Sequence, residues 1–207
     1  MERPILFNGD MVGAILEGRK SQTRRVVKLP SHIHKEDNGL YTLLADGVVY
    51  CNQHFEQVID YIKPPYQVGD TLWIRETWGM ISEFANIDPS VGLFDGYLYA
   101  TDGTYDGMKW HPSIHMPRKA ARIFLKVTGV RVERLCEMAY NSNNNNCETV
   151  ENFRKEGVMA NNGYFTALHD FKNLWNSTIK KQDLDRYGWN ANPYIWIIKF
   201  EVAKNER

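Results

Sequence analysis

The chain has 207 residues, of which 43% are hydrophobic and 13% aromatic, which is enough apolar material for a packed core. Lysine plus arginine and aspartate plus glutamate both number 25, so the overall charge does not point to nucleic acid and any anion site must be local. The three cysteines form no CxxC pair, which argues against a disulfide framework or a cysteine-based zinc site and suits a reducing cytoplasm.

Membrane and export segments are not indicated by the sequence. No stretch approaches the roughly 20 apolar residues that span a bilayer. The first ten residues, MERPILFNGD, lack a cationic run followed by a long apolar region, so no signal peptide is predicted. We therefore expect a cytoplasmic protein with no membrane partner.

The first predicted elements are a strand at residues 4–7 and a helix of about two turns, which Asn8 or Asp10 caps. Gly18 ends the helix, because glycine tolerates the positive φ of a helix C-terminus. A basic stretch, residues 17–25 (EGRKSQTRR), follows before extended structure resumes at Val26. Its four cations are Arg19, Lys20, Arg24 and Arg25.

The basic stretch has two interpretations. Its arginines could bind a phosphate or a base edge through their forked donors, or the stretch could be a solvated loop with ordinary surface ion pairs. Lys20 and Thr23 are three residues apart on a turn, so their side chains can face one another. A desolvated lysine loses its proton readily, so Lys20 could act as a base toward the Thr23 hydroxyl.

Two irregular insertions are predicted, near residues 29–65 and 79–117. The first holds a hairpin, with strands at 39–44 and 48–51 around Asp46-Gly47. The second holds a strand at 97–101.

The strand predicted at residues 71–78 (TLWIRETW) separates the insertions and places Arg75 and Glu76 on opposite faces. Whichever of the two points inward needs a partner. For Glu76 we consider Lys20, Arg24 or Arg25, either in a buried ion pair that orients a loop or in a site. Trp78, like Trp73, is either a core residue or a platform for a stacked base.

Histidines and an arginine close the second insertion, in KWHPSIHMPRK. His111 and His115 have the spacing of a helical zinc pair, but Pro112 and Pro117 oppose a helix there. We therefore predict no metal and no cofactor, and consider His115 and Arg118 as contacts for a ligand phosphate.

The rest of the chain predicts a long strand at residues 121–135 with a bend or bulge at Gly129, which is what a small barrel needs to turn a corner. Helices are expected at 149–156 and 164–179, and a closing strand at 193–202. Alternation along that strand puts one set of side chains on the same face: Tyr194, Trp196, Ile198, Phe200 and Val202. With no βαβ alternation, the pattern is typical of an α+β fold in one domain, residues 1–207, with a small, mostly antiparallel sheet or barrel and about three helices.

Taken in order, these segments resemble the ASCH domain family, a branch of the PUA-like β-barrel superfamily, and especially its longer members encoded by phages and prophages. The family motif G-x-K-x-x-E-x-R reads Gly18 to Arg25 here, with Thr23 where many members have Glu. The segments GDTLWIRETW, IHMPRKAARIFLKVTGVRVERL, RKEGV and NPYIWIIKFE are also similar to the phage group. The resemblance implies a PUA-like β-barrel.

For function, the resemblance implies a protein directed at nucleic acid or a nucleotide, with RNA, DNA or a modified nucleoside as partner. One ASCH subgroup with Thr at this position cleaves the amide of acetylated cytidine. The matching catalytic residues here are Lys20, Thr23 and Glu156, although Glu156 also reads as a plain charge in the last turn of a helix. The alternative is a binding module for RNA or modified DNA without catalysis. Whether the chain is an amidohydrolase, a nuclease or no enzyme stays open.

Overall fold

The computed structural model of the protein describes residues 1–28, 40–44, 47–51, 58–81, 96–103, 105–136 and 164–203. The helix expected at 149–156, and Glu156 with it, lies outside these residues. Within them, no helix is long and apolar enough to cross a membrane.

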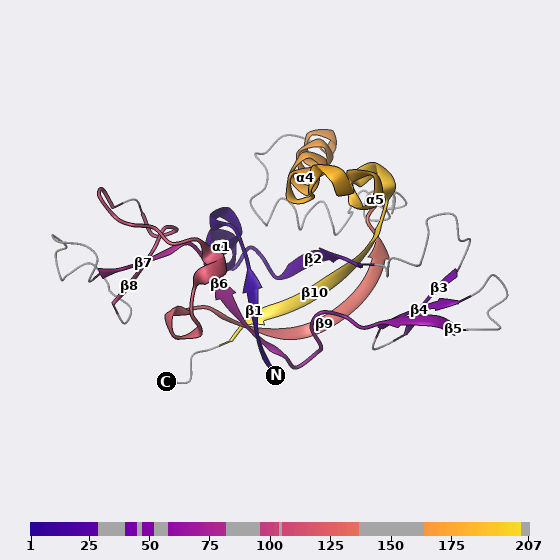
Figure 1. Ribbon diagram of the computed structural model, residues 1–207, viewed down its shortest axis with the longest axis horizontal. Coiled ribbons are helices and arrows are strands. Elements are labelled where there is room, and N and C mark those ends of the chain that lie inside the picture. Colours follow the sequence, from indigo (N-terminus) through magenta and orange to yellow (C-terminus); the bar gives the residue numbers. More distant parts are fainter. Residues whose placement is uncertain are drawn as a thin grey trace.

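A five-stranded sheet forms the centre of the protein (Figure 1). Its strands follow the order β1-β6-β9-β10-β2, with β1 and β6 parallel and the three other pairs antiparallel. This mixed sheet with packed helices confirms the expected α+β class. The strand bounds are β1 Glu2–Leu6, β2 Gln22–Val26, β6 Thr71–Arg75, β9 Phe124–Arg134 and β10 Tyr194–Val202.

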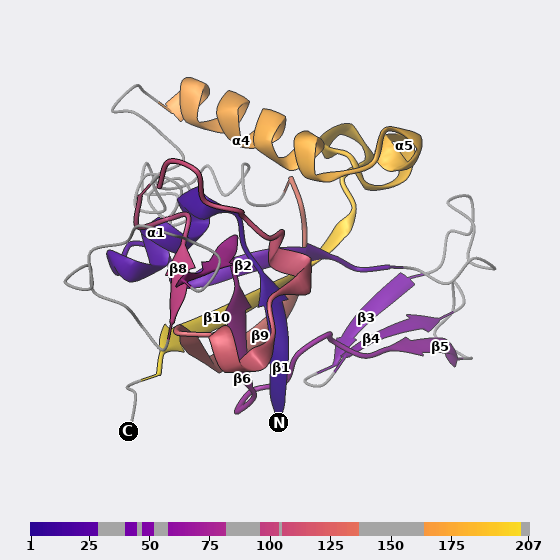
Figure 2. The ribbon, with the colours of Figure 1, turned by 60° about the vertical axis from the view of Figure 1, so that its left-hand side comes forward.

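Strand β10 shows why helices cover both faces of the sheet. Its even-numbered residues Trp196, Ile198 and Phe200 share a core with Val12 and Ile15 of α1 (Gly9–Leu16), as the alternation predicted. Its odd-numbered Ile195 and Ile197 pack with Phe171 and Trp175 of α4 (Tyr164–Thr178). Figure 2 shows α4, followed by α5 (Leu184–Tyr187), over the sheet. Two apolar faces on one strand require two covering layers.

The expected PUA-like β-barrel is wrong, because the sheet does not close: the edge strands β1 and β2 make no backbone ladder with each other. The backbone N–H and C=O groups of the even-numbered residues of β1 point to its free edge. One of these residues is Pro4, which has no N–H to donate. Side chains occupy two carbonyls of that edge instead. The Tyr66 hydroxyl donates to Pro4 O at 3.0 Å, and Arg25 Nη2 donates to Leu6 O at 2.9 Å. The sheet therefore stays open, with its free edge capped by side chains.

Smaller elements lie in the two insertion regions. The first region contains a sheet of β3 (Leu40–Leu44), β4 (Gly47–Cys51) and β5 (Val58–Ile62), which confirms the predicted hairpin and adds β5. In the second region, β7 (Trp78–Met80) pairs with β8 (Tyr97–Tyr99). The predicted strand 71–78 is thus divided between two sheets. Short 3-10 turns occupy Ser113–His115, Arg118–Ala120, Lys181–Asp183 and Trp189–Ala191.

Local signals explain the start and end of α1 and the bend of β9. The Asn8 side chain accepts a hydrogen bond from Met11 N at 2.9 Å, which caps the helix, and Gly18 has φ +71° just beyond it. In the pairing of β9 with β10 the register shifts between Gly129 and Val127, opposite Lys199 and Phe200. This shift is the predicted bulge, which bends the strand locally.

Candidate functional site

The basic stretch is divided between the two faces of the sheet rather than gathered in one loop. Arg25 pairs with Trp196 in β10 and lies over Phe7 on the α1 face, with 5.6 Å from Cζ to the ring centre. Arg24 pairs with Ile197 and lies over Phe171 on the α4 face, at 5.8 Å. Burial lowers the pKa of Arg25 from its ordinary value. Within β2, the two arginines therefore do not converge on one anion.

Between these arginines and the end of α1, polar side chains are buried. Lys20 is 6% exposed, Gln22 4% and Thr23 3%. The backbone N–H groups of Arg19 and Lys20 both donate to Ala14 O, at 2.8 and 3.0 Å, which ties this segment to the last turn of α1. Burying a polar side chain without a hydrogen-bond partner costs several kcal/mol. Three buried polar side chains within four residues therefore make this segment a candidate site rather than an ordinary surface loop.

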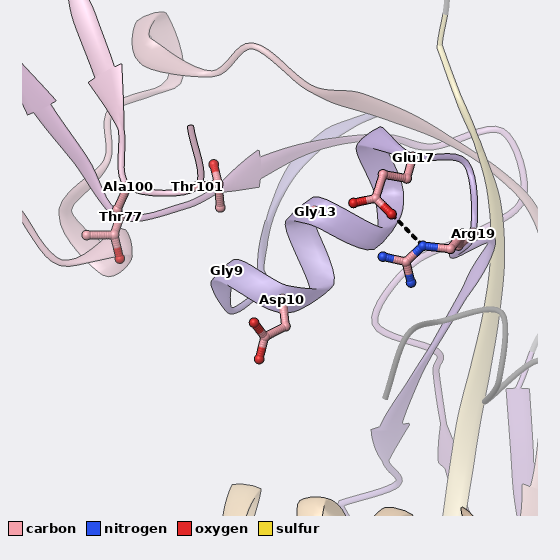
Figure 3. Close-up of a pocket in the computed structure, with 8 residues that line it drawn as sticks. All are labelled: Gly9, Asp10, Gly13, Glu17, Arg19, Thr77, Ala100 and Thr101. Carbon is pink, nitrogen blue, oxygen red and sulfur yellow. Dashed lines mark hydrogen bonds and ion pairs between the residues drawn. The ribbon is translucent and has the colours of Figure 1, made fainter. Parts of the chain in front are cut away.

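A cleft of about 470 Å³ runs along α1 (Figure 3). On the helix side it is lined by Gly9, Asp10, Gly13, Glu17 and, just beyond the helix, Arg19. Thr77, Ala100 and Thr101 line it beyond the helix N-terminus.

The helical face that borders the cleft has no side chain at two of its positions, Gly9 and Gly13. Gly9, Gly13 and Glu17 are four residues apart, so they share one face of α1. A Cβ added at Gly13 would meet no atom within 4 Å. The two glycines therefore leave helix backbone open to a flat ligand.

The charges of the cleft are mixed. Glu17 accepts a hydrogen bond from Arg19 Nε at 2.5 Å, and this bond holds the pKa of Glu17 below its usual range. Asp10 adds a second carboxylate in the first turn of α1. Only Arg19 offsets these two carboxylates among the described lining residues, so the cleft does not favour a phosphate.

A partly buried ionic network borders the cleft at Thr101. Arg122 donates to both oxygens of Glu76, at 2.9 Å from Nε and 3.0 Å from Nη2, and to both oxygens of Asp102, at 2.6 and 2.8 Å. Its guanidinium lies 3.9 Å from the centre of the Tyr99 ring. Burial alone would lower the pKa of Arg122, but the hydrogen bonds to the two carboxylates raise it instead. Arg122 therefore stays charged and anchors both acids.

Thr101 joins this network to the cleft. Its hydroxyl donates to Glu76 Oε2 at 2.6 Å and accepts from Arg122 Nη2 at 2.8 Å. A Cβ on Gly9 would lie 3.6 Å from the Thr101 methyl group, so α1 begins directly beside it. Thr101 is thus both a cleft residue and a member of the network.

Glu76 is only 1% exposed, and its ion-pair partner is Arg122 rather than Lys20, Arg24 or Arg25. Sequence reasoning missed Arg122, which lies 46 residues from Glu76. The available signal was that both charges flank strongly apolar strands, where each needs a partner.

Arg75 and Trp78 both contact other protein groups, although Arg75 Nε and Trp78 Nε1 are buried without a hydrogen-bond partner in the described part of the chain. Arg75 lies over Trp73 at 4.7 Å and donates to Ile114 O at 3.2 Å. Trp78 is 7% exposed and stacks on His111 at 4.9 Å between ring centres. These contacts favour the core interpretation of Trp78 over a base-stacking role.

The remaining predicted contacts lie away from the cleft lining. Arg118 donates to both oxygens of Glu2, at 2.9 and 3.1 Å, and lowers the pKa of that carboxyl. It also lies over Phe124 at 4.4 Å. His115 is exposed in a 3-10 turn. In the described part of the chain, no group of three or more His, Cys, Asp or Glu side chains is placed to hold a metal ion.

Comparison with known proteins does not extend this description. No family model, no curated protein and no solved structure matches the chain.

Proposed function

We propose that the chain is a cytoplasmic, ASCH-like protein directed at nucleic acid or nucleotides, and that it hydrolyses an N-acylated, cytidine-type nucleoside or nucleic acid. The observation that carries this proposal is the burial of Lys20 and Thr23, three residues apart, in the segment that directly follows the cleft residue Arg19. A surface loop with ordinary ion pairs would leave these side chains in water.

The proposed chemistry needs a nucleophile and a base, with Thr23 and Lys20 in those roles. The Thr23 oxygen attacks the acyl carbon while its proton passes to Lys20. The amide C–N bond breaks, the cytosine amine leaves with that proton, and an acyl ester forms on Thr23. Water then hydrolyses the ester, which releases the carboxylic acid and restores the Thr23 hydroxyl.

A carboxylate completes the proposed set. The resemblance assigns this role to Glu156, which lies outside the described residues. Glu76 is the most buried carboxylate of the described part and reaches the cleft through Thr101. Glu156→Gln and Glu76→Gln, each checked for folding, distinguish the two: the residue that acts in the site loses turnover.

The test measures acid release from N4-acetylcytidine by purified protein. Lys20→Ala and Thr23→Val should each lower kcat/KM about 100-fold or more, because a positioned base contributes about 10²–10⁴-fold. Lys199→Ala is the matched control, since Lys199 is an exposed lysine on the same sheet, opposite Gln22. Unchanged turnover in folded Lys20→Ala would refute the proposed mechanism.

The same preparation tests the binding-only alternative. A protein that releases no acid but binds RNA or modified DNA, with affinity that falls steeply as salt rises, would be a reader rather than a hydrolase.

A further inference from the structure

The hydrogen-bond capacity of Thr101 is only partly used by the protein. A threonine hydroxyl offers one donor and two acceptor positions. The donor goes to Glu76 at 2.6 Å, and one acceptor position takes Arg122 Nη2 at 2.8 Å. One acceptor position remains on this oxygen, and Thr101 lines the cleft with its methyl group next to Gly9.

The direction of this hydroxyl is fixed by its surroundings. Glu76 forms an ion pair with Arg122, so the Glu76 carboxylate is ionised and can only accept hydrogen bonds. The Thr101 hydroxyl must therefore be the donor in its bond to Glu76. Asp102 holds the other side of the same guanidinium at 2.6 Å. Because Arg122 is held by two carboxylates and by the Tyr99 ring, the hydroxyl cannot turn its proton toward the cleft without losing its bond to Glu76.

The rest of the cleft agrees with this polarity. Asp10 and Glu17 add acceptors, and the Arg19 Nε donor is engaged by Glu17. Gly9 and Gly13 leave a flat, open helix surface next to Thr101. Such a surface accepts a planar ring, and its polar end accepts N–H groups.

We propose that Thr101 is a ligand-contacting, specificity-determining residue that accepts a hydrogen bond from an exocyclic amino or acylamino N–H of a planar base, with Arg122 as the residue that positions its hydroxyl. The inference rests on the proposed function for the class of ligand. The inference adds the atom that would distinguish the two kinds of base, the Thr101 hydroxyl oxygen. This oxygen would accept a hydrogen bond from a base with an amino group but not from a base with a carbonyl at the same position.

The experiment titrates the whole protein with cytidine and with uridine, which have similar shape and charge but present an amino group and a carbonyl, respectively, at the same ring position. Backbone NMR shifts of Gly13 and Thr101 report binding in the cleft. Thr101→Val removes the hydroxyl at nearly constant volume, and Thr101→Ser keeps it. Thr77→Val is the control, because Thr77 lines the same cleft and its side chain makes no hydrogen bond in the described part of the chain.

Cytidine should shift both amides and bind more tightly than uridine. Thr101→Val should weaken cytidine binding about tenfold and abolish the preference, since one buried hydrogen bond corresponds to about that factor. Thr101→Ser and Thr77→Val should stay within about twofold of the parent. A purely structural role for Thr101 would instead make Thr101→Val weaken cytidine and uridine binding alike and leave the preference unchanged.

Three results would each overturn the inference. The first is equal binding of cytidine and uridine, and the second is an unchanged preference in Thr101→Val. The third is no shift of the Gly13 and Thr101 amides with either nucleoside at about 10 mM, roughly the weakest binding such a titration detects. Acid release from N4-acetylcytidine is measured in parallel. Turnover with no cytidine preference refutes the role of Thr101 alone, whereas a cytidine preference without turnover refutes the hydrolase alone.

Discussion

The buried Arg122–Glu76 pair allows a sharp test of the network. Arg122→Met removes the guanidinium and leaves the Glu76 carboxylate, 1% exposed, with the Thr101 hydroxyl as its one side-chain donor among the described residues. Removing one partner of a buried ion pair costs about 3–5 kcal/mol of unfolding free energy. For a chain of this size each kcal/mol corresponds to about 2–4 °C, so a loss of about 4 kcal/mol should lower Tm by about 8–16 °C.

Two further variants separate the charge effect from packing. Asp102→Asn changes the partly exposed acid, 40% accessible at its side chain, and should cost about 0–1 kcal/mol. Adding Glu76→Gln to Arg122→Met removes the stranded charge, so the double variant should be more stable than Arg122→Met alone by about 1–3 kcal/mol.

Urea unfolding followed by tryptophan fluorescence and circular dichroism measures these differences, and coincident curves establish that one transition is observed. The reasoning fails if Arg122→Met costs less than about 1 kcal/mol. It also fails if Glu76→Gln lowers the stability of Arg122→Met further, because the carboxylate would then not be stranded.

Four further substitutions test stability. Gly13→Ala should raise the unfolding free energy by about 0.5–1 kcal/mol, because the methyl group meets no atom, and Gly18→Ala should lower it by about 1 kcal/mol, because Gly18 has φ +71°; urea midpoints decide both. Burial alone would raise the pKa of Asp70. Hydrogen bonds from the backbone N–H of Gln67 and from the amino group of Met1 hold this pKa below its ordinary value instead. Asp70→Asn should therefore lower the urea midpoint at pH 7, by an amount that shrinks as pH falls through about 4 and the parent carboxyl is protonated. Arg25→Met should cost about 1–2 kcal/mol, through the lost hydrogen bond to the edge of β1 and the lost contact with Phe7; a smaller thermal shift than in Arg122→Met would be expected.

Elements with local causes were predictable from the sequence. The Asn8 cap, the Gly18 terminus and the Gly129 bulge each depend on one residue and its immediate neighbours. The closing strand was predictable because its even-numbered residues are all large and apolar. Its odd-numbered Ile195 and Ile197 form a second buried face, which α4 covers and which was not predicted.

The start of β2 and the open sheet could not be predicted in this way. A run of Thr and Arg reads as a loop, yet Arg24 and Arg25 lie across Phe171 and Phe7 and so shield the two apolar faces of an edge strand. Barrel closure depends on whether β1 and β2 pair, and nothing local to either strand decides that except Pro4. The Arg122 network escaped prediction for the same reason, since its members come from three separate segments of the chain.

The structure also changes the weight of the two functional alternatives. In an extended nucleic-acid interface, arginines present free forks along a groove. Here Arg24, Arg25, Arg75 and Arg118 each lie over an aromatic ring of the protein, and the last three also donate to its own oxygens. The cleft beside α1 has two carboxylates against one guanidinium among its described lining. Both observations favour a small, amino-bearing ligand over a phosphate backbone, so salt should have little effect on the binding of a short, cytidine-containing RNA oligonucleotide. A steep fall in that affinity between 50 and 200 mM salt, the range over which phosphate-contacting proteins lose about 10³–10⁵ in affinity, would return the balance to the nucleic-acid reader.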